Sequence, residues 1–210
     1  MKRGAGRGRE GSPGGMPGAA PYGRRALYGG MVELECPARL RDVAEVRPVP
    51  DHQECFVDAA ADQSLIVEVL ELKAGVGGAG QPPAAEFFFR DLAEANEALE
   101  HAVLELRELA PGELPHLAAC RGSVALGVQR VVKHREDDAT GNRVAMLLAN
   151  IRIPEKDTDI LLTVNTPVEV SPESSISELG DAPLRAAGEA RALFFHALKT
   201  FKINDWGLFG

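Results

Sequence analysis

Acidic side chains beside a stiff turn are the residues of this sequence with the clearest chemical potential. In RPVPDHQECF, residues 47–56, two prolines come shortly before Asp51 and Glu54. Proline lowers the entropy that a loop loses when a partner orders it, so the prolines favour a binding role for these two carboxylates. Three further carboxylates lie near this turn in the sequence: Asp42, Glu68 and Glu71. Together the five predict an acidic interaction surface, although for any single carboxylate simple solvation of the surface is the commoner role.

The sequence carries no motif typical of catalysis, of metal binding or of a nucleotide site. Its five histidines are too dispersed for a metal motif, and C-x-x-C, G-x-S-x-G and GxxxxGK[ST] do not occur. Gly75, Gly77 and Gly80 do spell G-x-G-x-x-G, the pattern of a dinucleotide-binding turn. Because two prolines follow at once and no parallel β-α-β unit surrounds the pattern, we expect a flexible loop there. We therefore expect no enzyme, no cofactor and no metal.

Charge is unevenly distributed along the 210 residues. Residues 1–25 hold six Lys or Arg and one acidic residue, which leaves 17 basic and 30 acidic residues, a net charge of −13, for residues 26–210. Such a domain disfavours nucleic acid and anionic membrane as partners and favours a basic protein surface. The Gly- and Arg-rich leader, 1–25, lacks periodicity and is predicted to be disordered, as a solubility tail rather than an RNA contact or import signal.

The remaining composition predicts one intracellular domain, residues 26–210. The three cysteines, Cys36, Cys55 and Cys120, are an odd number without framework spacing and are expected to be reduced thiols. No apolar run approaches the roughly 18 to 20 residues that a membrane span needs. The N-terminal residues lack the apolar core of a secretory signal.

Apolar runs bounded by turn residues predict most of the strands. Strands are expected at 26–34, with a bulge or close packing at the glycine pair of that segment, and at 54–58, 123–134, 144–153 and 159–165. The strands at 123–134 and 144–153 are expected to pair around an acidic turn. The strand at 159–165 is apolar enough to be central. A polar loop then precedes a closing helix from about 183 to 202.

The segment 62–73 fits either a helix or a strand. As a strand, Glu68 would share a face with Ile66 and Leu70. As a helix, Glu68 and Glu71 would lie together outside an apolar stripe. A helix is favoured because Asp62 is a good N-cap residue.

The next part of the chain is harder to assign. Residues 87–89, three phenylalanines, are expected to form a core strand, and Asp91 to cap a short helix at 92–96. Residues 98–107 tolerate both a helix and a strand, and their pattern leaves the choice open. Strands gathered in sequence, with helices between and after them, predict a mainly antiparallel sheet with helices packed on it.

Several segments, in order over residues 26–210, resemble the Ran guanine nucleotide release factor family. They are LYGG (27–30), RPVPDHQE (47–54), DQSLIVEVLE (62–71), DLAEAN (91–96), TDILLTVNTP (158–167) and WGLF (206–209). The resemblance implies a single α/β/α sandwich on a mostly antiparallel sheet, similar to the PsbP fold, with a strand at 98–107. It also implies a monomer that is not an enzyme, binds Ran, promotes release of guanine nucleotide such as GTP, and serves nuclear transport.

The resemblance also implies where the partner binds. The family's Ran-contacting loop corresponds to Asp42, Asp51 and Glu54, and its second acidic pair to Glu68 and Glu71. His52 departs from the family pattern and is expected to be a tolerated turn residue rather than a pH switch. The family implies action in the nucleus and cytoplasm. Its alternative role is that of an adaptor for delivery of a voltage-gated sodium channel to the plasma membrane.

Overall fold

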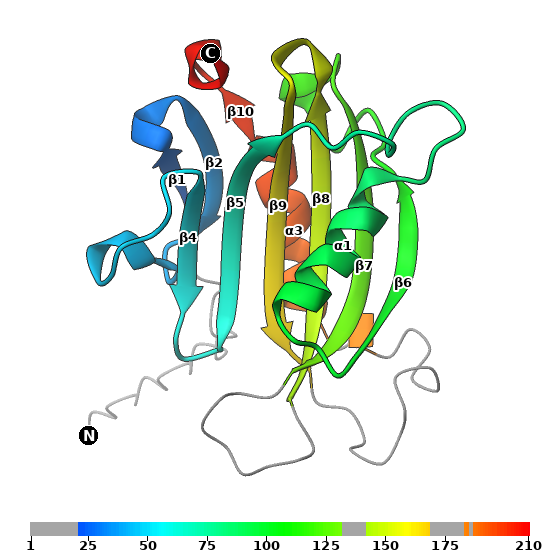
Figure 1. The fold of residues 1–210 in the computed structure, drawn as a ribbon. Coiled ribbons are helices and arrows are strands. Elements are labelled where there is room, and N and C mark those ends of the chain that lie inside the picture. Colours follow the sequence, from blue (N-terminus) through cyan, green and yellow to red (C-terminus); the bar gives the residue numbers. More distant parts are fainter. Residues whose placement is uncertain (1–20, 132–141, 169–182, 185–186) are drawn as a thin grey trace, which may run out of the picture.

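The computed structural model describes residues 21–131, 142–168, 183–184 and 187–210, which form two antiparallel sheets and two longer helices (Figure 1). The main sheet has the strand order β3-β4-β5-β9-β8-β7-β6, and all its neighbouring strands are antiparallel. Its strands are β3 (Arg41–Asp42), β4 (Gln53–Asp58), β5 (Gln63–Glu71), β6 (Glu100–Glu108), β7 (Arg121–Val131), β8 (Asn142–Ile153) and β9 (Thr158–Pro167). The small sheet has the order β1-β2-β10, with β1 (Tyr22–Leu27), β2 (Val32–Pro37) and β10 (Lys202–Ile203).

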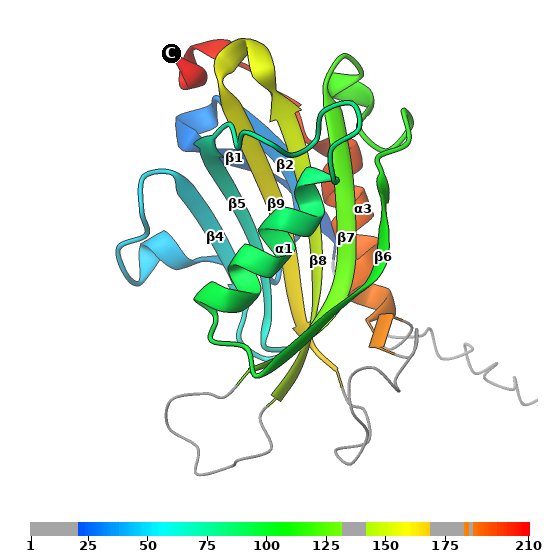
Figure 2. The same cartoon turned by 45° about the vertical axis from the view of Figure 1, so that its right-hand side comes forward.

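The main sheet is covered on both faces. Helix α1 (Ala84–Ala95) lies on one face, and helix α3 (Gly188–Thr200) lies on the other with the small sheet (Figures 1 and 2). Two apolar cores result: Val124, Leu126 and Val128 pack in the α3 core, while Ala125 packs in the α1 core. Burial on both faces explains the continuous apolar runs of the central strands. The expected α/β/α layering on a mostly antiparallel sheet is confirmed.

Most of the expected strands are present. Strands β4, β8 and β9 match the runs predicted at 54–58, 144–153 and 159–165, and β9 is the central strand of its sheet. Strand β7 pairs with β8 as predicted, and β6 confirms the strand implied at 98–107. The acidic turn at 137–141 and the polar loop before the closing helix lie outside the described residues.

The helix favoured at 62–73 is wrong, because this segment is strand β5. Leu65 and Val67 are fully buried in the α3 core, and Leu70 packs against the α1 core from the opposite face. With apolar residues on both faces, the strand lacks the polar alternation that would have distinguished it from a helix. Asp62 caps no helix and lies in a left-handed turn with φ 49°.

The core strand predicted at 87–89 is also wrong, since the three phenylalanines lie inside helix α1. This helix begins at Ala84, so Asp91 lies within it and does not cap a helix at 92–96. Its buried residues recur at helical spacing: Ala84, Ala85, Phe88, Phe89 and Ala93. Three consecutive aromatic residues are too short a run to show that period.

The chain reverses at the glycine pair instead of continuing through a bulge. Leu27 ends β1, a 3-10 turn follows at Tyr28–Gly30, and Val32 begins β2. Gly29 and Gly30 have φ of 65° and 95°, a region that glycine adopts without steric cost. Strand β1 also begins at Tyr22, so the expectation of disorder up to residue 25 is corrected for residues 22–25. No helix among the described residues has the length and apolarity to cross a membrane.

Candidate functional site

The turn between β1 and β2 fixes the acidic strand β4. The main-chain N–H of Tyr28 donates to a carboxylate oxygen of Glu54 at 2.6 Å. The Tyr28 hydroxyl lies 3.0 Å from the carbonyl oxygen of His52 and 2.9 Å from that of Val67, so it joins β4 and β5 to the turn. Tyr28 itself has φ 49°, which a non-glycine residue adopts only where surrounding contacts hold it.

The pKa of the Tyr28 hydroxyl is affected by burial and by nearby negative charge. Burial, and after it the charges of Glu54 and Glu68, raises the pKa of the Tyr28 hydroxyl above its ordinary value. The hydroxyl therefore stays protonated and remains a hydrogen-bond donor near neutral pH.

Asp51 is presented at the tip of the RPVP turn. The N–H of Gln53 donates to the carbonyl of Pro50 at 2.9 Å, which closes the turn, and the N–H of Val69 donates to His52 at 2.9 Å. Asp51 and His52 are both exposed between these two anchors. The backbone of the turn is therefore fixed while the Asp51 side chain faces solvent.

Asp42 stabilises the local backbone near the RPVP turn. Its side chain accepts a hydrogen bond of 2.8 Å from the N–H of Ala44 and so caps the 3-10 turn Val43–Glu45. Beyond this turn the RPVP segment covers a hollow of about 250 Å³ whose lining includes Gln53 and Cys55. Burial raises the pKa of the Cys55 thiol, against the opposing charge of Arg47.

Glu68 and Glu71 are not on one face, so their predicted pairing is wrong. In a strand, residues three apart point to opposite sides. Glu68 accepts a hydrogen bond of 3.0 Å from the side chain of Gln53, its partner on β4. Glu71 is exposed at the end of β5, opposite Thr158 on β9.

Four of the five predicted carboxylates lie at one edge of the main sheet, on β3, β4, β5 and the RPVP turn, with Glu54 and Glu68 on opposite faces of the sheet. We call this the acidic corner: Asp42, Asp51, Glu54 and Glu68. Within the described residues, no group of three or more His, Cys, Asp or Glu side chains is arranged to hold a metal ion. The acidic corner therefore offers separate, fixed negative charges, which suit ion pairs with basic side chains.

The sequence pattern did not single out Tyr28 or Gln53 as residues that hold this corner. Gln53 lies within RPVPDHQECF, the segment whose carboxylates already predicted a binding role. Tyr28 precedes the glycine pair, and only the left-handed turn that this pair forms brings its N–H to Glu54. A contact across 26 positions has no signal in local spacing.

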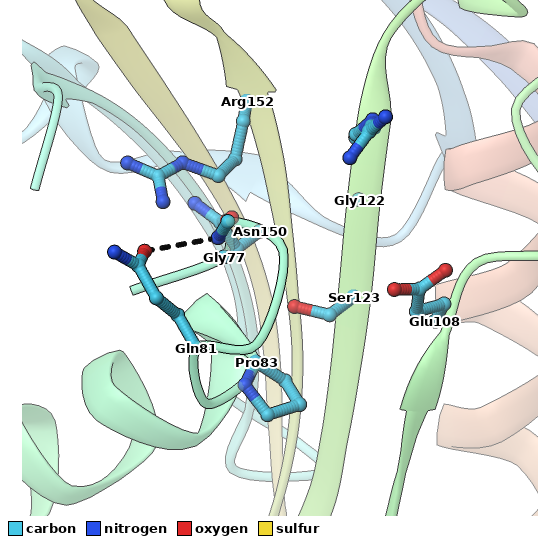
Figure 3. A pocket seen from close by; sticks show the side chains of 10 residues that line it. Gly77, Gln81, Pro83, Glu108, Gly122, Ser123, Asn150 and Arg152 are labelled. Atoms are coloured by element: carbon cyan, nitrogen blue, oxygen red, sulfur yellow. Dashed lines mark hydrogen bonds between the residues drawn. The ribbon is translucent and has the colours of Figure 1, made fainter. Parts of the chain in front are cut away.

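A second hollow lies near the glycine-rich loop, on the α1 side of the sheet (Figure 3). Arg152 and Asn150 border it from β8, Ser123 from β7, and Gln81 from the loop. Its volume is about 50 Å³, which is room for a few water molecules at most.

The Arg152 guanidinium is already occupied by protein groups. It forms an ion pair of 3.0 Å with the buried Asp159, and it donates to the carbonyl of Lys73 at 2.6 Å and to that of Val76. The N–H of Gly77 donates to Pro82 at 2.8 Å. The predicted loop is confirmed, but it is clamped to the sheet, and its donors are turned inward rather than toward a nucleotide.

Comparison with known proteins places the chain in a family. A sequence model described as "Mog1: Ran-interacting Mog1 protein" matches residues 25–167. The Homo sapiens protein named "Ran guanine nucleotide release factor" is 34% identical over 185 residues, covering 88% of this chain and 95% of that protein. The Danio rerio protein of the same name is 34% identical over 195 residues, covering 89% and 99%.

A solved structure agrees with the fold. The crystal structure of the Saccharomyces cerevisiae Ran-binding protein Mog1p superposes with a TM-score of 0.67 at 22% identity, and the match covers 91% of this chain and 100% of that one. At this identity the likeness supports the fold alone. The sequence matches extend over most of the chain, so the protein described above belongs to the Mog1 family.

Proposed function

We propose that this protein binds the small GTPase Ran and promotes release of its bound guanine nucleotide, acting in nucleocytoplasmic transport. Curated relatives are named for Ran guanine nucleotide release, and a Schizosaccharomyces pombe relative is named "Nuclear import protein mog1". The observation that carries the proposal is the acidic corner, in which Glu54 is fixed by the Tyr28 N–H and Asp51 is exposed on a closed turn.

The mechanism rests on linkage between two ligands of one GTPase. GTPases of this class hold nucleotide through backbone amides, a lysine and Mg²⁺ around the phosphates. A release factor must bind the nucleotide-free form more tightly, because each ligand then weakens the other equally. Tenfold weakening requires about 1.4 kcal/mol of differential binding.

The acidic corner can supply this difference through charge. Asp51 and Glu54 pair with basic groups of Ran that lose their partner when phosphate leaves. Only one oxygen of Glu54 is engaged by Tyr28, so the other remains for a cation. Charge-assisted pairs of this kind are stronger than neutral hydrogen bonds, and prior fixation of the backbone reduces the entropy lost on binding. Glu68 acts as an anchor next to this pair, and Glu71 is a separate anchor at the end of β5.

The test is release of fluorescently labelled GTP from Ran, measured with the wild-type chain and with the double variant Asp51→Asn/Glu54→Gln. Both changes remove charge, and Gln retains an oxygen that accepts the Tyr28 N–H. We expect stimulated release to fall to the rate of Ran alone while the circular dichroism spectrum and Tm stay at wild-type values.

The matched control is Asp91→Asn/Glu94→Gln, which removes two exposed charges at the same spacing from helix α1. This control is expected to stimulate release as the wild type does. Equal stimulation by the two double variants would show that the acidic corner has no part in release.

Delivery of a voltage-gated sodium channel, the alternative role that the family resemblance implies, stays a prediction. It requires a different surface from the acidic corner. If that role applies, Asp51→Asn/Glu54→Gln is expected to lose stimulated release and yet support channel current at the plasma membrane of transfected cells.

A further inference from the structure

The C-terminal turn of the chain holds an exposed tryptophan in a fixed position. Trp206 begins the 3-10 turn Trp206–Phe209 and is 42% exposed, although it is among the largest apolar side chains. Its ring lies 5.9 Å from that of Phe209, and the side chain of Asp205 caps the turn by accepting the N–H of Gly207 at 2.8 Å. Tryptophan combines a large apolar ring with a polar N–H and is enriched at protein interfaces, so an accessible indole on an ordered turn is a candidate contact residue.

This turn is tied to the same β1–β2 turn that fixes the acidic corner. The N–H groups of Asn204 and Asp205 both donate to the carbonyl of Met31, at 2.8 and 3.1 Å. The Asn204 side chain donates to Gly30 at 3.2 Å. Tyr28, at the start of that turn, donates to Glu54. One short turn therefore connects Trp206 on one side with Glu54 on the other.

The two cartoon views agree on this arrangement. The C-terminal turn, the β1–β2 turn and the start of β4 lie at the same end of the molecule in both (Figures 1 and 2). The opposite side of the C-terminal turn is also anchored, because the Lys156 ammonium donates to the carbonyl of Gly210 at 2.7 Å. The turn that carries Trp206 is thus anchored on two sides, and one of its anchors is the β1–β2 turn that also binds Glu54.

We propose that Trp206 extends the Ran-binding surface and stacks on a Lys or Arg side chain of Ran. The inference rests on the proposed function. Charge complementarity selects this partner, because Asp205 precedes the tryptophan directly and the β1–β2 turn links the C-terminal turn to Glu54 of the acidic corner. A cation above an indole face gains both electrostatic attraction and contact with its aliphatic stem. Tryptophan is also the side chain most enriched among residues that dominate binding energy.

The unaltered chain provides a direct test, because Trp206 is its only tryptophan. Biosynthetic labelling with 5-fluorotryptophan gives one ¹⁹F resonance, which is recorded before and after addition of unlabelled, nucleotide-free Ran. We expect the resonance to shift and its exposure to a soluble paramagnetic quencher to fall. An unmoved resonance in a sample shown to contain the complex would overturn the inference.

Substitutions identify the kind of contact. Trp206→Ala and Trp206→Leu are expected to weaken binding to nucleotide-free Ran tenfold or more, whereas Trp206→Phe retains an aromatic face and loses less than threefold. Leu106→Ala is the matched control, since Leu106 is 38% exposed on β6, at the far edge of the main sheet. If Leu retains binding as well as Phe does, the contact is apolar and the proposed cation is wrong.

The outcomes separate this inference from the proposed function. In one outcome the wild type binds Ran, Asp51→Asn/Glu54→Gln does not, and all Trp206 variants bind with wild-type affinity. That outcome would contradict only the proposed role of Trp206. If the wild type neither binds Ran nor stimulates release, both proposals fail.

Discussion

The carboxylate of Glu54 accepts a hydrogen bond of 2.6 Å from the main chain of Tyr28, a residue 26 positions earlier in the chain. This contact turns a surface carboxylate into a charge with a fixed location. The Tyr28 hydroxyl adds contacts to the carbonyls of His52 and Val67, so the β1–β2 turn holds both strands of the acidic corner.

Tyr28→Phe is expected to lower the free energy of unfolding by about 1 to 2 kcal/mol, because it removes the hydroxyl that donates to the Val67 carbonyl in a part-buried contact. Urea denaturation measures this effect. Stimulated nucleotide release from Ran should also decline, since β4 loses one of its ties to the turn. A variant with unchanged stability and release would show that the Glu54 contact alone positions the strand.

Asp159→Asn is expected to destabilise the protein by about 3 to 5 kcal/mol, because it leaves the buried Arg152 guanidinium without its counter-charge. Urea denaturation again provides the measurement. Glu86→Gln serves as the control, since it breaks an exposed i,i+4 ion pair with Arg90 and should cost under about 0.5 kcal/mol. Similar losses in the two variants would contradict the importance of burial at Arg152.

Gly127→Ala tests the close approach of helix α1 to the sheet. A Cβ at this position would meet the carbonyl oxygen of Ala102 and would lie 2.7 Å from the Phe89 ring. We expect a loss of about 1 to 3 kcal/mol in the free energy of unfolding, as for other overpacked sites. Gly23→Ala, where nothing lies within 4 Å of the new methyl group, should leave the Tm nearly unchanged.

Glu113 should make stability depend on pH in the acid range. Hydrogen bonds from Arg107, against the opposing effect of partial burial, lower the pKa of the Glu113 carboxyl. The stability that this carboxylate adds is fully present above its ordinary pKa of about 4.5 and is lost as the pH falls through the lower folded-state pKa. The difference in unfolding free energy between wild type and Glu113→Gln should therefore shrink as the pH is lowered below about 4.5. A pH-independent difference would contradict this linkage.

Sequence patterns predicted the strands whose apolar runs are long enough to exclude other structures. Strands β8 and β9 are such runs, and both lie at the centre of the sheet. Strand β5 resembles a helix in sequence because apolar residues lie on both its faces, although only the face with Leu65 and Val67 is fully buried, so its residue types do not alternate clearly. The register between strands, which decides that Gln53 faces Glu68, depends on pairings that a linear pattern does not contain.

The acidic corner was partly predictable for a similar reason. Its residues cluster in the sequence around RPVP, and this clustering placed Asp42, Asp51 and Glu54 together. The pairing of Glu68 with Glu71 failed with the helix on which it depended. The contacts that fix the corner, from Tyr28, come from another sheet and lie beyond the reach of local spacing.

The position of β9 next to β5 also has a consequence for how the chain reaches this fold. The side chains of Ser64 and Asn165 meet across this pairing although they are 101 positions apart. During synthesis, β5 is complete long before its central partner exists, so one of its edges stays unpaired in the meantime. Pairings of such high sequence separation form slowly, and an open strand edge can recruit another chain. We therefore expect that chaperones must bind and protect nascent chains until β9 has left the ribosome.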